Sequence, residues 1–369
     1  MLIKSHVNQL KDIPEAKAVE QAFVAGYWAV VQKGKYKVGD PVDFLPEDSV
    51  ILEHVDGFNF LGNIKEIPVE DPNNEELFEK VRGRKVSAKR VLQVISQGLV
   101  VDPGILKESD IRKYSPEAKF AMSSSKGSSC GIWGRTLGHR PSWLLKTDSE
   151  NVQRTISTLS PEEARDWLER VLRCGPTLKL DGSSITVTMS VKDGKVSVYS
   201  RTLEREATHL RNGLFERVGA ENILRGIEKF YGDWWGDGFN VKAGDRHPEI
   251  VGFHGELMGP KFNGNREQFF REELFVYRVF YKVRESVYYN PPEDIEKLKE
   301  YIPELSDLWV PEISKHSVTV EHVLDNKELT LKSFNQSIPA EGVVFYNPDD
   351  PQGFETYKFI NPLYLLGKR

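Results

Sequence analysis

The chain has 369 residues, of which 39% are hydrophobic and 28% are charged, a balance typical of a globular protein and not of a disordered one. The 50 Lys and Arg residues are outnumbered by 55 Asp and Glu residues, so a basic field over the whole protein is excluded, and contact with nucleic acid would need a local cluster of cations. Two cysteines are too few for a disulfide framework or a thiolate zinc site, and the length predicts two domains.

The first part of the chain has the pattern of several short β-strands. Residues 18–31 (AVEQAFVAGYWAVV) and 49–56 (SVILEHVD) cluster β-forming side chains, and residues 90–104 contain two more short strands around Gln97-Gly98. Residues 33–49 carry two Gly and two Pro and are dense in turn formers. Strands at this spacing predict a small barrel or sandwich, and we favour an OB-type barrel.

Residues 123–142 (SSSKGSSCGIWGRTLGHRPS) are rich in Ser, Gly and basic side chains and nearly free of acidic ones. This composition indicates either a linker or a flexible basic surface that could touch phosphate, and both interpretations remain open. We place a domain boundary near its end. The prediction is therefore an all-β OB-type domain over residues 1–142 and a second domain over residues 143–369.

The chain shows no targeting or membrane segment. Its first twenty residues are charged and lack the apolar centre of a signal peptide. No apolar run approaches the length that spans a bilayer. We therefore expect an intracellular, cytoplasmic protein with no membrane partner.

The second part of the chain alternates helix and strand patterns. Residues 160–172 (SPEEARDWLERVL) predict a helix with Ser160 as N-cap and Glu163 completing a capping box. Residues 183–201 predict a β-hairpin, with a type I′ turn at Asp193-Gly194. Two more helices are expected at 220–231 and 291–302 and two buried strands at 273–283 and 341–346, so the fold class is α+β built on antiparallel sheets.

The stretch 178–184 (LKLDGSS) places a lysine and an aspartate in a predicted strand. Lys179 lies between two leucines, and partial desolvation lowers the pKa of a lysine toward the neutral, nucleophilic form. Asp181, two positions on, is expected on the same strand face, within reach of Mg²⁺ or its water shell. A surface strand with a Lys and an Asp at a turn explains this stretch alone equally well.

Other segments add groups of matching chemistry. Arg201 ends the predicted hairpin, Glu256 and Glu341 each stand beside a short apolar run, and Lys358 lies in the last predicted strand. Residues 273–283 form an aromatic strand, in which Phe275, Tyr277 and Val279 are expected on one face. Taken singly, each glutamate fits a strand-end charge and Tyr277 fits a core residue. His254 and the pair Trp234-Trp235 are expected to pack.

In this order the segments KLDGSS, SRTLE, HGELMGP, LFVYRVF, AEGVVFY and YKFI resemble the motif series of covalent nucleotidyltransferases, the polynucleotide ligases and mRNA-capping enzymes. The match covers about half of the chain, from Lys179 on. Residues 35–51, QVISQGLVV, LKTDSENVQ and GELMGPKFNGNRE further resemble ATP-dependent RNA ligases with an OB-type domain ahead of the catalytic domain. Only eleven residues follow Lys358, so we expect no C-terminal OB domain of the kind found in DNA ligases and capping enzymes.

The resemblance implies an activity and roles for the residues. Lys179 would attack the α-phosphate of ATP and hold AMP, which would pass to the 5′-phosphate of an RNA whose 3′-OH end is then joined, at nicks or bridged breaks. Lys358 would neutralise phosphate, assisted by Lys146 or Arg201, and Tyr277 and Leu180 would contact the nucleotide. Asp181, Glu256 and Glu341 would hold Mg²⁺ or Mn²⁺, or one of them the ribose.

The chain departs from the family pattern at four places. Ile360 stands where a second lysine is common, Thr202 where asparagine is common, Leu145 where arginine is frequent, and Arg278 where an acidic residue is more usual. None of these positions is the expected nucleophile or one of the expected carboxylates. The phosphate contact of the last strand therefore depends on Lys358 alone.

Two other hypotheses remain beside an RNA ligase that acts as a monomer. A DNA ligase or capping-type enzyme shares the motif series, and the use of GTP instead of ATP would identify a capping enzyme. A non-catalytic RNA-end-binding protein could keep the fold, and the presence of Lys179, Glu256, Glu341 and Lys358 argues against this.

Overall fold

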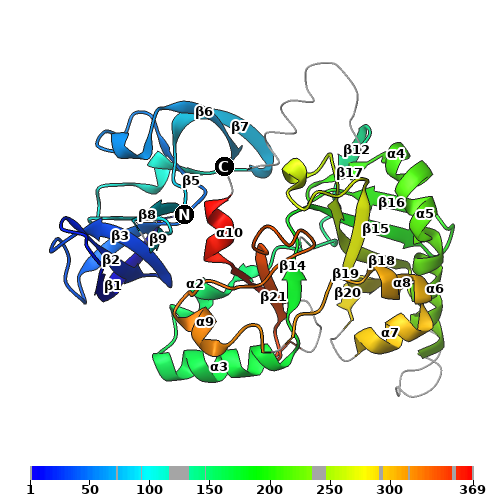
Figure 1. The fold of residues 1–369 in the computed structure, drawn as a ribbon. Helices are drawn as coiled ribbons and strands as arrows, with labels where there is room; N and C mark the ends of the chain where they lie inside the picture. The colour runs from blue at the N-terminus through cyan, green and yellow to red at the C-terminus, as the bar shows by residue number, and fades with distance from the viewer. Residues whose placement is uncertain are drawn as a thin grey trace.

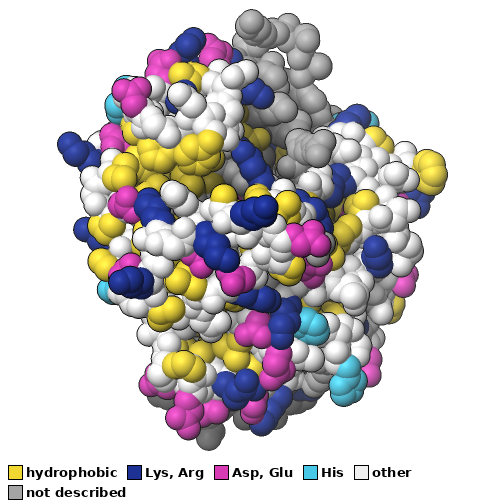
Figure 2. Space-filling view, turned by 60° about the vertical axis from the view of Figure 1, so that its left-hand side comes forward, with side chains coloured by type: hydrophobic (Ala, Val, Ile, Leu, Met, Phe, Trp, Pro, Cys, Tyr) yellow, Lys and Arg dark blue, Asp and Glu magenta, His cyan; other side chains and the backbone are white. Residues whose placement is uncertain are grey.

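The computed structural model describes residues 2–71, 74–92, 94–115, 133–145, 147–234, 247–290, 294–314, 316–350 and 355–367. In Figure 1 the N-terminal strands, in blue and cyan, gather on one side, and the second half of the chain forms the rest of the molecule. None of the described helices is long and apolar enough to cross a membrane. On the face shown in Figure 2, basic and acidic side chains are interspersed around a hydrophobic patch at the upper left.

Within its described residues, the N-terminal half consists of strands and two short 3-10 turns, Asn59–Leu61 and Glu108–Asp110. One five-stranded sheet has the order β10 (Leu99–Val101), β4 (Pro41–Leu45), β1 (Ile3–Asp12), β2 (Val19–Val24) and β3 (Tyr27–Gln32). A four-stranded sheet has the order β11 (Ile111–Lys113), β5 (Ser49–Leu52), β7 (Asn74–Lys85) and β6 (Lys65–Asp71), and β8 (Lys89–Val91) pairs with β9 (Val94–Ser96).

The five-stranded sheet curls until its two edges approach each other. The backbone N–H of Gln97, just ahead of β10, donates to the carbonyl oxygen of Trp28 on β3 at 2.8 Å. Gly98 has a φ of +75°, and a Cβ there would overlap Phe44 and the Leu45 backbone, so this corner needs glycine. The near closure confirms the predicted OB-type barrel. The turn-dense stretch 33–49 also holds β4, whose buried side chains Val42 and Phe44 join the barrel core.

The second half contains two further sheets. The larger has the order β12 (Thr136–His139), β17 (Leu203–Arg205), β16 (Val196–Tyr199), β15 (Ser183–Ser190), β18 (Ile250–Met258), β19 (Glu273–Val283) and β20 (Ser286–Tyr289). The smaller has the order β13 (Glu150–Asn151), β22 (Thr356–Ile360), β21 (Gly342–Tyr346) and β14 (Thr177–Lys179). All these pairings are antiparallel except β13 with β22, so the α+β class is confirmed with one parallel edge.

Helices cover the outer faces of both sheets. The larger sheet shares a core with α6 (Ala220–Trp234), α7 (Ile295–Tyr301) and α8 (Pro303–Leu308), and the smaller sheet with α2 (Val152–Ile156), α3 (Pro161–Arg173) and α9 (Val320–Leu324). The remaining helical turns are α4 (Thr208–Leu210), the π-helical turn Arg211–Phe215, α5 (Glu216–Val218), the 3-10 turn Asn263–Asn265, and α10 (Pro362–Leu366). Helix α3 begins with the predicted capping box of Ser160 and Glu163.

Two local predictions in the second half are wrong. The hairpin turn has a positive φ at Gly194 and not at Asp193, and Gly194 N–H donates to Ser190 O, so a longer loop replaces the type I′ turn. In β19 a bulge opposite His254-Gly255 shifts the alternation. Val279 therefore joins Val276 in the large core and does not share a face with Tyr277.

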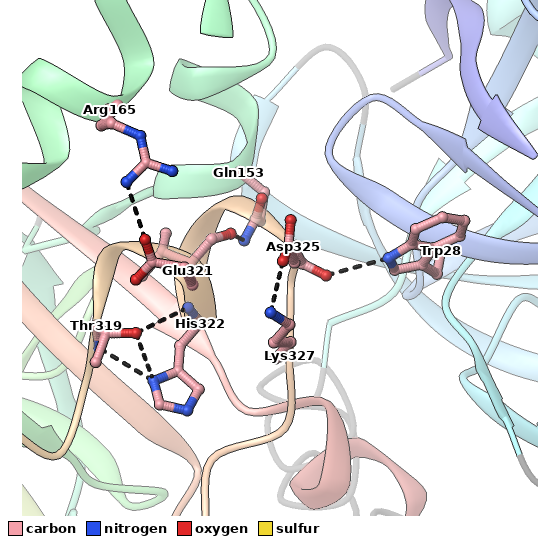
Figure 3. A network of polar contacts seen from close by, with 9 residues as sticks. Trp28, Gln153, Arg165, Thr319, Glu321, His322, Asp325 and Lys327 are labelled. Atoms are coloured by element: carbon pink, nitrogen blue, oxygen red, sulfur yellow. Dashed lines mark hydrogen bonds and ion pairs between the residues drawn. The ribbon is translucent and has the colours of Figure 1, made fainter. Parts of the chain in front are cut away.

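The barrel contacts the second half through its β3 edge (Figure 3). The indole N–H of Trp28 donates to the carbonyl oxygen of Asp325, just after α9, at 3.1 Å. The side-chain amide of Asn326 donates to Gln97 Oε1 at 2.7 Å, and both residues are buried. Strand β12 precedes residue 142 and pairs within the larger sheet, so residues just ahead of the predicted boundary already belong to the fold of the second half.

Candidate active site

A pocket of about 170 Å³ lies where the two sheets of the second half meet. The smaller sheet contributes Lys179 and Lys358, and the larger sheet contributes Glu256 and Tyr277. The other lining residues are Thr147, Asp148, Ser149, Thr177, Leu178, Leu180, Ser184, Arg278, Val310, Val344, Tyr346 and Thr356. The structure therefore brings five of the predicted site residues, Lys179, Leu180, Glu256, Tyr277 and Lys358, into one concave site.

Lys179 is the last residue of β14, and strand register gives it an acidic neighbour. It pairs with Gly342, the first residue of β21, which places Glu341 at the same end of the sheet. Lys179 Nζ lies 2.9 Å from Glu341 Oε2, with 23% and 8% of the two side chains exposed. The amine thus lies at the pocket wall, partly shielded from water and held by a buried carboxylate.

Directly after Lys179 the chain crosses from the smaller to the larger sheet. The strand ends, residues 180–182 form the crossing, and β15 begins at Ser183. The N–H of Gly182 donates to Glu256 Oε1 at 3.0 Å, and a Cβ on Gly182 would overlap the Leu257 carbonyl oxygen. Burial raises the pKa of Glu256 to about 8; Glu341 and Asp181 add to this rise, and Lys179 opposes it.

The crossing changes the expected placement of Asp181. The prediction that it shares a strand face with Lys179 is wrong, because β14 ends at Lys179. Asp181 does not line the pocket among the described residues; it accepts hydrogen bonds from the Tyr364 hydroxyl and, at 3.2 Å, from Asn263 Nδ2. It remains close enough to raise the pKa of Glu256.

Tyr277 reaches the pocket because of the bulge in β19. Its hydroxyl donates to Thr147 Oγ1 at 3.0 Å, and its backbone carbonyl accepts from the Tyr346 hydroxyl at 2.8 Å. Tyr277 is therefore held at its hydroxyl and at its backbone. Its neighbour Arg278 is 3% exposed and lines the same pocket and an adjoining one of about 250 Å³.

Strand β22 contributes one cation, Lys358, to the pocket lining. Burial lowers the pKa of Lys358 to about 8, and repulsion from Lys179 adds to this effect. Arg201 lies outside the pocket lining and binds Asp148 Oδ2 at 2.5 Å. Burial acts to raise the pKa of Asp148, but Arg201 and Lys358 outweigh it and lower the pKa. Lys146 lies outside the described residues.

Several residues of the site were not predicted from the sequence. Thr147 and Asp148 belong to the segment LKTDSEN, which pointed to Lys146 instead. Tyr364 follows an Asn-Pro helix start, Asn361-Pro362, that predicts α10 but gives no indication of a contact with Asp181. His254 packs as expected: it is fully buried, stacks on Phe280 at 4.6 Å, and its Nδ1 lies 2.7 Å from Thr186 Oγ1.

The carboxylates around Lys179 offer oxygen donors for a hard cation. Mg²⁺ is usually held by one or two carboxylates together with waters and substrate phosphates. The described residues contain no group of three His, Cys, Asp or Glu arranged as a ready-made cage. Burial raises the pKa of Glu256, the nearby carboxylates of Glu341 and Asp181 add to that rise, and a cation would relieve this repulsion. The donor set therefore fits a hydrated divalent ion.

Comparison with known families matches two parts of the chain. A family model of an OB-fold domain matches residues 2–103, and a family model described as RNA ligase matches residues 176–360. Comparison with curated protein sequences gives no match.

Among solved structures the chain is similar to the RNA ligase of Naegleria gruberi. A lysine-to-alanine variant with ATP and Mn superposes with a TM-score of 0.68 at 22% identity, covering 99% of this chain and 98% of that one. A glutamate-to-alanine variant with ATP and Mn gives 0.68 at 23% identity, covering 99% and 98%. A lysine-to-methionine variant with AMP and Mn gives 0.67 at 21%, covering 100% and 99%. At this identity the likeness shows the fold, a barrel followed by a two-sheet domain.

Proposed function

The chain belongs to the RNA ligase family, whose model spans half of its length, and from that premise we propose that it is an ATP-dependent RNA ligase that forms a covalent AMP intermediate on Lys179. The observation that carries the proposal is the position of Lys179 Nζ at the wall of a pocket, 2.9 Å from Glu341, with Glu256, Tyr277 and Lys358 also lining it. ATP and Mn are bound by the similar Naegleria enzyme in its structures.

In the first step Lys179 Nζ would attack the α-phosphorus of ATP. A bond from nitrogen to phosphorus forms, the bond from phosphorus to the bridging oxygen breaks, and pyrophosphate leaves. An ammonium cannot attack, so Nζ must first lose a proton, and the Glu341 carboxylate is placed to accept it. The buried ion pair thus both orients the nucleophile and supplies a proton acceptor.

The other lining residues supply binding and charge. Lys358 would contact the α-phosphate, because this residue lines the same pocket as Lys179. Arg201 would assist from outside the pocket lining through its ion pair with Asp148, and Lys146 remains a proposed second cation. Tyr277 would stack on the adenine, and Leu180 would form part of the apolar wall beside it.

Glu256, Glu341 and Asp181 are the residues we propose to hold Mg²⁺ or Mn²⁺, directly or through waters. When bound, the metal would neutralise charge on phosphate oxygens during transfer. Asp181 would take part from outside the pocket lining, in the orientation that Tyr364 and Asn263 give it.

The AMP would then pass from Lys179 to the 5′-phosphate of an RNA end, and attack by a 3′-OH would join the ends and release AMP. We propose that the N-terminal barrel within residues 1–142 holds RNA beside the pocket at nicks or bridged breaks, and that residues 143–369, together with β12, carry the chemistry. Lys113 of β11 supports this, because it lies close enough to Asp148 of the pocket to help lower the pKa of that carboxyl.

The proposal is tested by incubating the protein with Mg²⁺ and ATP labelled on the α-phosphate. We expect label on the protein from ATP and not from GTP, and none on Lys179→Ala. Lys179→Ala should still seal an RNA whose 5′ end is already adenylylated. Label from GTP alone would indicate a capping-type enzyme, and no label from either nucleotide would indicate a non-catalytic RNA-end-binding protein.

A further inference from the structure

The C-terminal helix α10 contacts the turn that follows the proposed nucleophile. The hydroxyl of Tyr364, on α10, donates to Asp181 Oδ2, and the Tyr364 side chain is among the largest fully buried ones at 1% exposure. The guanidinium carbon of Arg266 lies 4.0 Å from the centre of the Tyr364 ring. Two contacts therefore fix the phenol: Asp181 binds its oxygen, and the Arg266 guanidinium packs on the face of its ring.

Helix α10 is itself tied to the segment that carries Glu341. Asn361, its N-cap, is fully buried, and its backbone N–H donates to the Glu341 carbonyl oxygen at 2.8 Å. The Asn361 side chain donates to the carbonyl oxygens of Leu329 and Ala340 at 3.0 and 3.2 Å and accepts from the N–H of Leu329 at 3.1 Å. The same short helix thus contacts both the Glu341 backbone and the Asp181 side chain. In Figure 1 it lies between the N-terminal strands and the smaller sheet.

Asp181 receives a second hydrogen bond from the loop between β18 and β19. Asn263 Nδ2 donates to Asp181 Oδ1 at 3.2 Å and also to the carbonyl oxygen of Gly182. Two neutral donors from two different parts of the chain therefore act on the two oxygens of one carboxylate. A carboxylate held at both oxygens has its plane fixed, since rotation about its terminal bond would break one contact or the other.

We propose that Tyr364 is a positioning residue for metal binding, which acts by orienting the Asp181 carboxylate toward the site of the divalent cation. This inference rests on the proposed function, in which Asp181 is one of the carboxylates that hold the metal. Groups that orient metal-binding side chains through hydrogen bonds typically change metal affinity or activity by about 10- to 100-fold when they are removed.

The test compares Tyr364→Phe with Tyr36→Phe, because the Tyr36 hydroxyl donates to Asp102 Oδ1 at 2.8 Å in the barrel and so offers a matched tyrosine–aspartate pair away from the site. Mn²⁺ affinity is measured by water-proton relaxation with ATP present, in a Lys179→Ala background where AMP transfer is blocked. The Mg²⁺ dependence of adenylylation is measured with Lys179 intact, and thermal unfolding is followed for every variant.

We expect Tyr364→Phe to weaken Mn²⁺ binding by about tenfold and to raise the half-saturating Mg²⁺ concentration by a similar factor, with the maximal rate restored at high metal. Tyr36→Phe should match the unmodified protein in both assays. Asn263→Gly, which removes the second donor at a residue with a φ of +40°, should shift metal binding in the same direction and provides the test if Tyr364→Phe fails to fold.

Unchanged Mn²⁺ affinity and Mg²⁺ dependence in a folded Tyr364→Phe, or in Asn263→Gly if the tyrosine variant does not fold, would overturn the inference while leaving the proposed function intact. A lower maximal rate at every metal concentration, with unchanged Mn²⁺ affinity, would also overturn it, since that result indicates a general structural role. If the unmodified protein forms no AMP adduct with ATP at any metal concentration, the proposed function fails and this inference fails with it.

Discussion

Lys179, the last residue of β14, forms an ion pair with Glu341, which directly precedes the neighbouring strand β21, although 161 residues of the chain separate them. The pairing of Lys179 with Gly342 brings Glu341, the residue before Gly342, to the same end of the sheet, where its carboxylate reaches Lys179 Nζ. The nucleophile is therefore held by the backbone register of the smaller sheet, and the Glu341 carboxylate lies 2.9 Å from its amine.

Glu341→Gln should slow adenylylation of Lys179 by about 10²-fold or more, because it removes both the counter-charge and the proton acceptor beside Nζ. The rate is measured in a single turnover with ATP labelled on the α-phosphate. Glu321→Gln is the control, since Glu321 pairs with Arg165 on the exposed surface, with 54% of its side chain accessible. Equal rates for the two glutamine variants would contradict a role of Glu341 in activating the lysine.

The lowered pKa of Lys358 predicts a pH effect on the same reaction. The pKa of Lys358 is about 8 in the folded state, against the ordinary 10.5. Below pH 8 the side chain is therefore charged in both the folded and the unfolded state. Between pH 8 and 10.5 it is neutral in the folded state and charged in the unfolded state. Its contact with phosphate therefore weakens as pH rises above 8, and kcat/KM for ATP, which reports the free enzyme, should fall.

Lys358→Arg identifies the source of that fall, because a guanidinium keeps its charge throughout this range. The ratio of kcat/KM for Lys358→Arg to that of the unmodified protein should rise between pH 8 and 10, and effects common to both proteins cancel in the ratio. The free energy of unfolding of the unmodified protein should also rise over this range, since the unfolded chain binds the extra proton. In Lys358→Met the free energy of unfolding should no longer rise over this range. A kcat/KM ratio that stays constant between pH 8 and 10 would show that Lys358 does not lose its proton there.

Much of the site could be predicted from the sequence because its residues stand in short ordered motifs. Lys179, Glu256, Tyr277 and Lys358 all line one pocket as the motif order implied. The placement of Asp181 could not be predicted, because strand periodicity says nothing of where a strand ends. Here β14 stops at Lys179, and the chain crosses to the other sheet within three residues.

The bulge in β19 could not be predicted from the alternation of side chains along a strand either. An extra residue reverses which side chains face the core, and nothing in residues 273–283 marks the position of that residue. The contacts of Tyr364 also escape sequence reasoning, since they join a C-terminal helix to a turn 183 residues earlier. Such contacts depend on tertiary packing and not on local propensity.

The ring of Tyr277, and not its hydroxyl, should determine ATP binding. Tyr277→Phe removes only the hydroxyl contacts, with Thr147 Oγ1 at 3.0 Å and Ser184 Oγ at 3.5 Å, so we expect KM for ATP to change by less than about threefold. Tyr277→Leu removes the aromatic face, and loss of stacking worth about 1–3 kcal/mol should raise KM by roughly 5- to 150-fold. The two KM values are measured in the adenylylation assay, and an equal effect of Phe and Leu would show that the hydroxyl contact matters instead.

Gly26 lets the barrel pack closely against the second half, and this contact should contribute measurably to the free energy of unfolding. This residue has a φ of +84°, and a Cβ there would lie 2.7 Å from the Gln153 carbonyl oxygen across the contact. Gly34 has a similar φ of +73° but open space around it, so Gly34→Ala carries the backbone strain without the clash.

Gly34→Ala should lower the free energy of unfolding by about 1 kcal/mol, and Gly26→Ala by about 1–3 kcal/mol more, because the clash pushes the barrel away from α2. Unfolding in urea measures both values. If the barrel must stay docked to present RNA to the pocket, Gly26→Ala should also lower nick sealing more than it lowers adenylylation of Lys179, whereas Gly34→Ala should leave that ratio unchanged. Equal stability of the two alanine variants would mean that the contact at Gly26 yields to the added methyl group without loss.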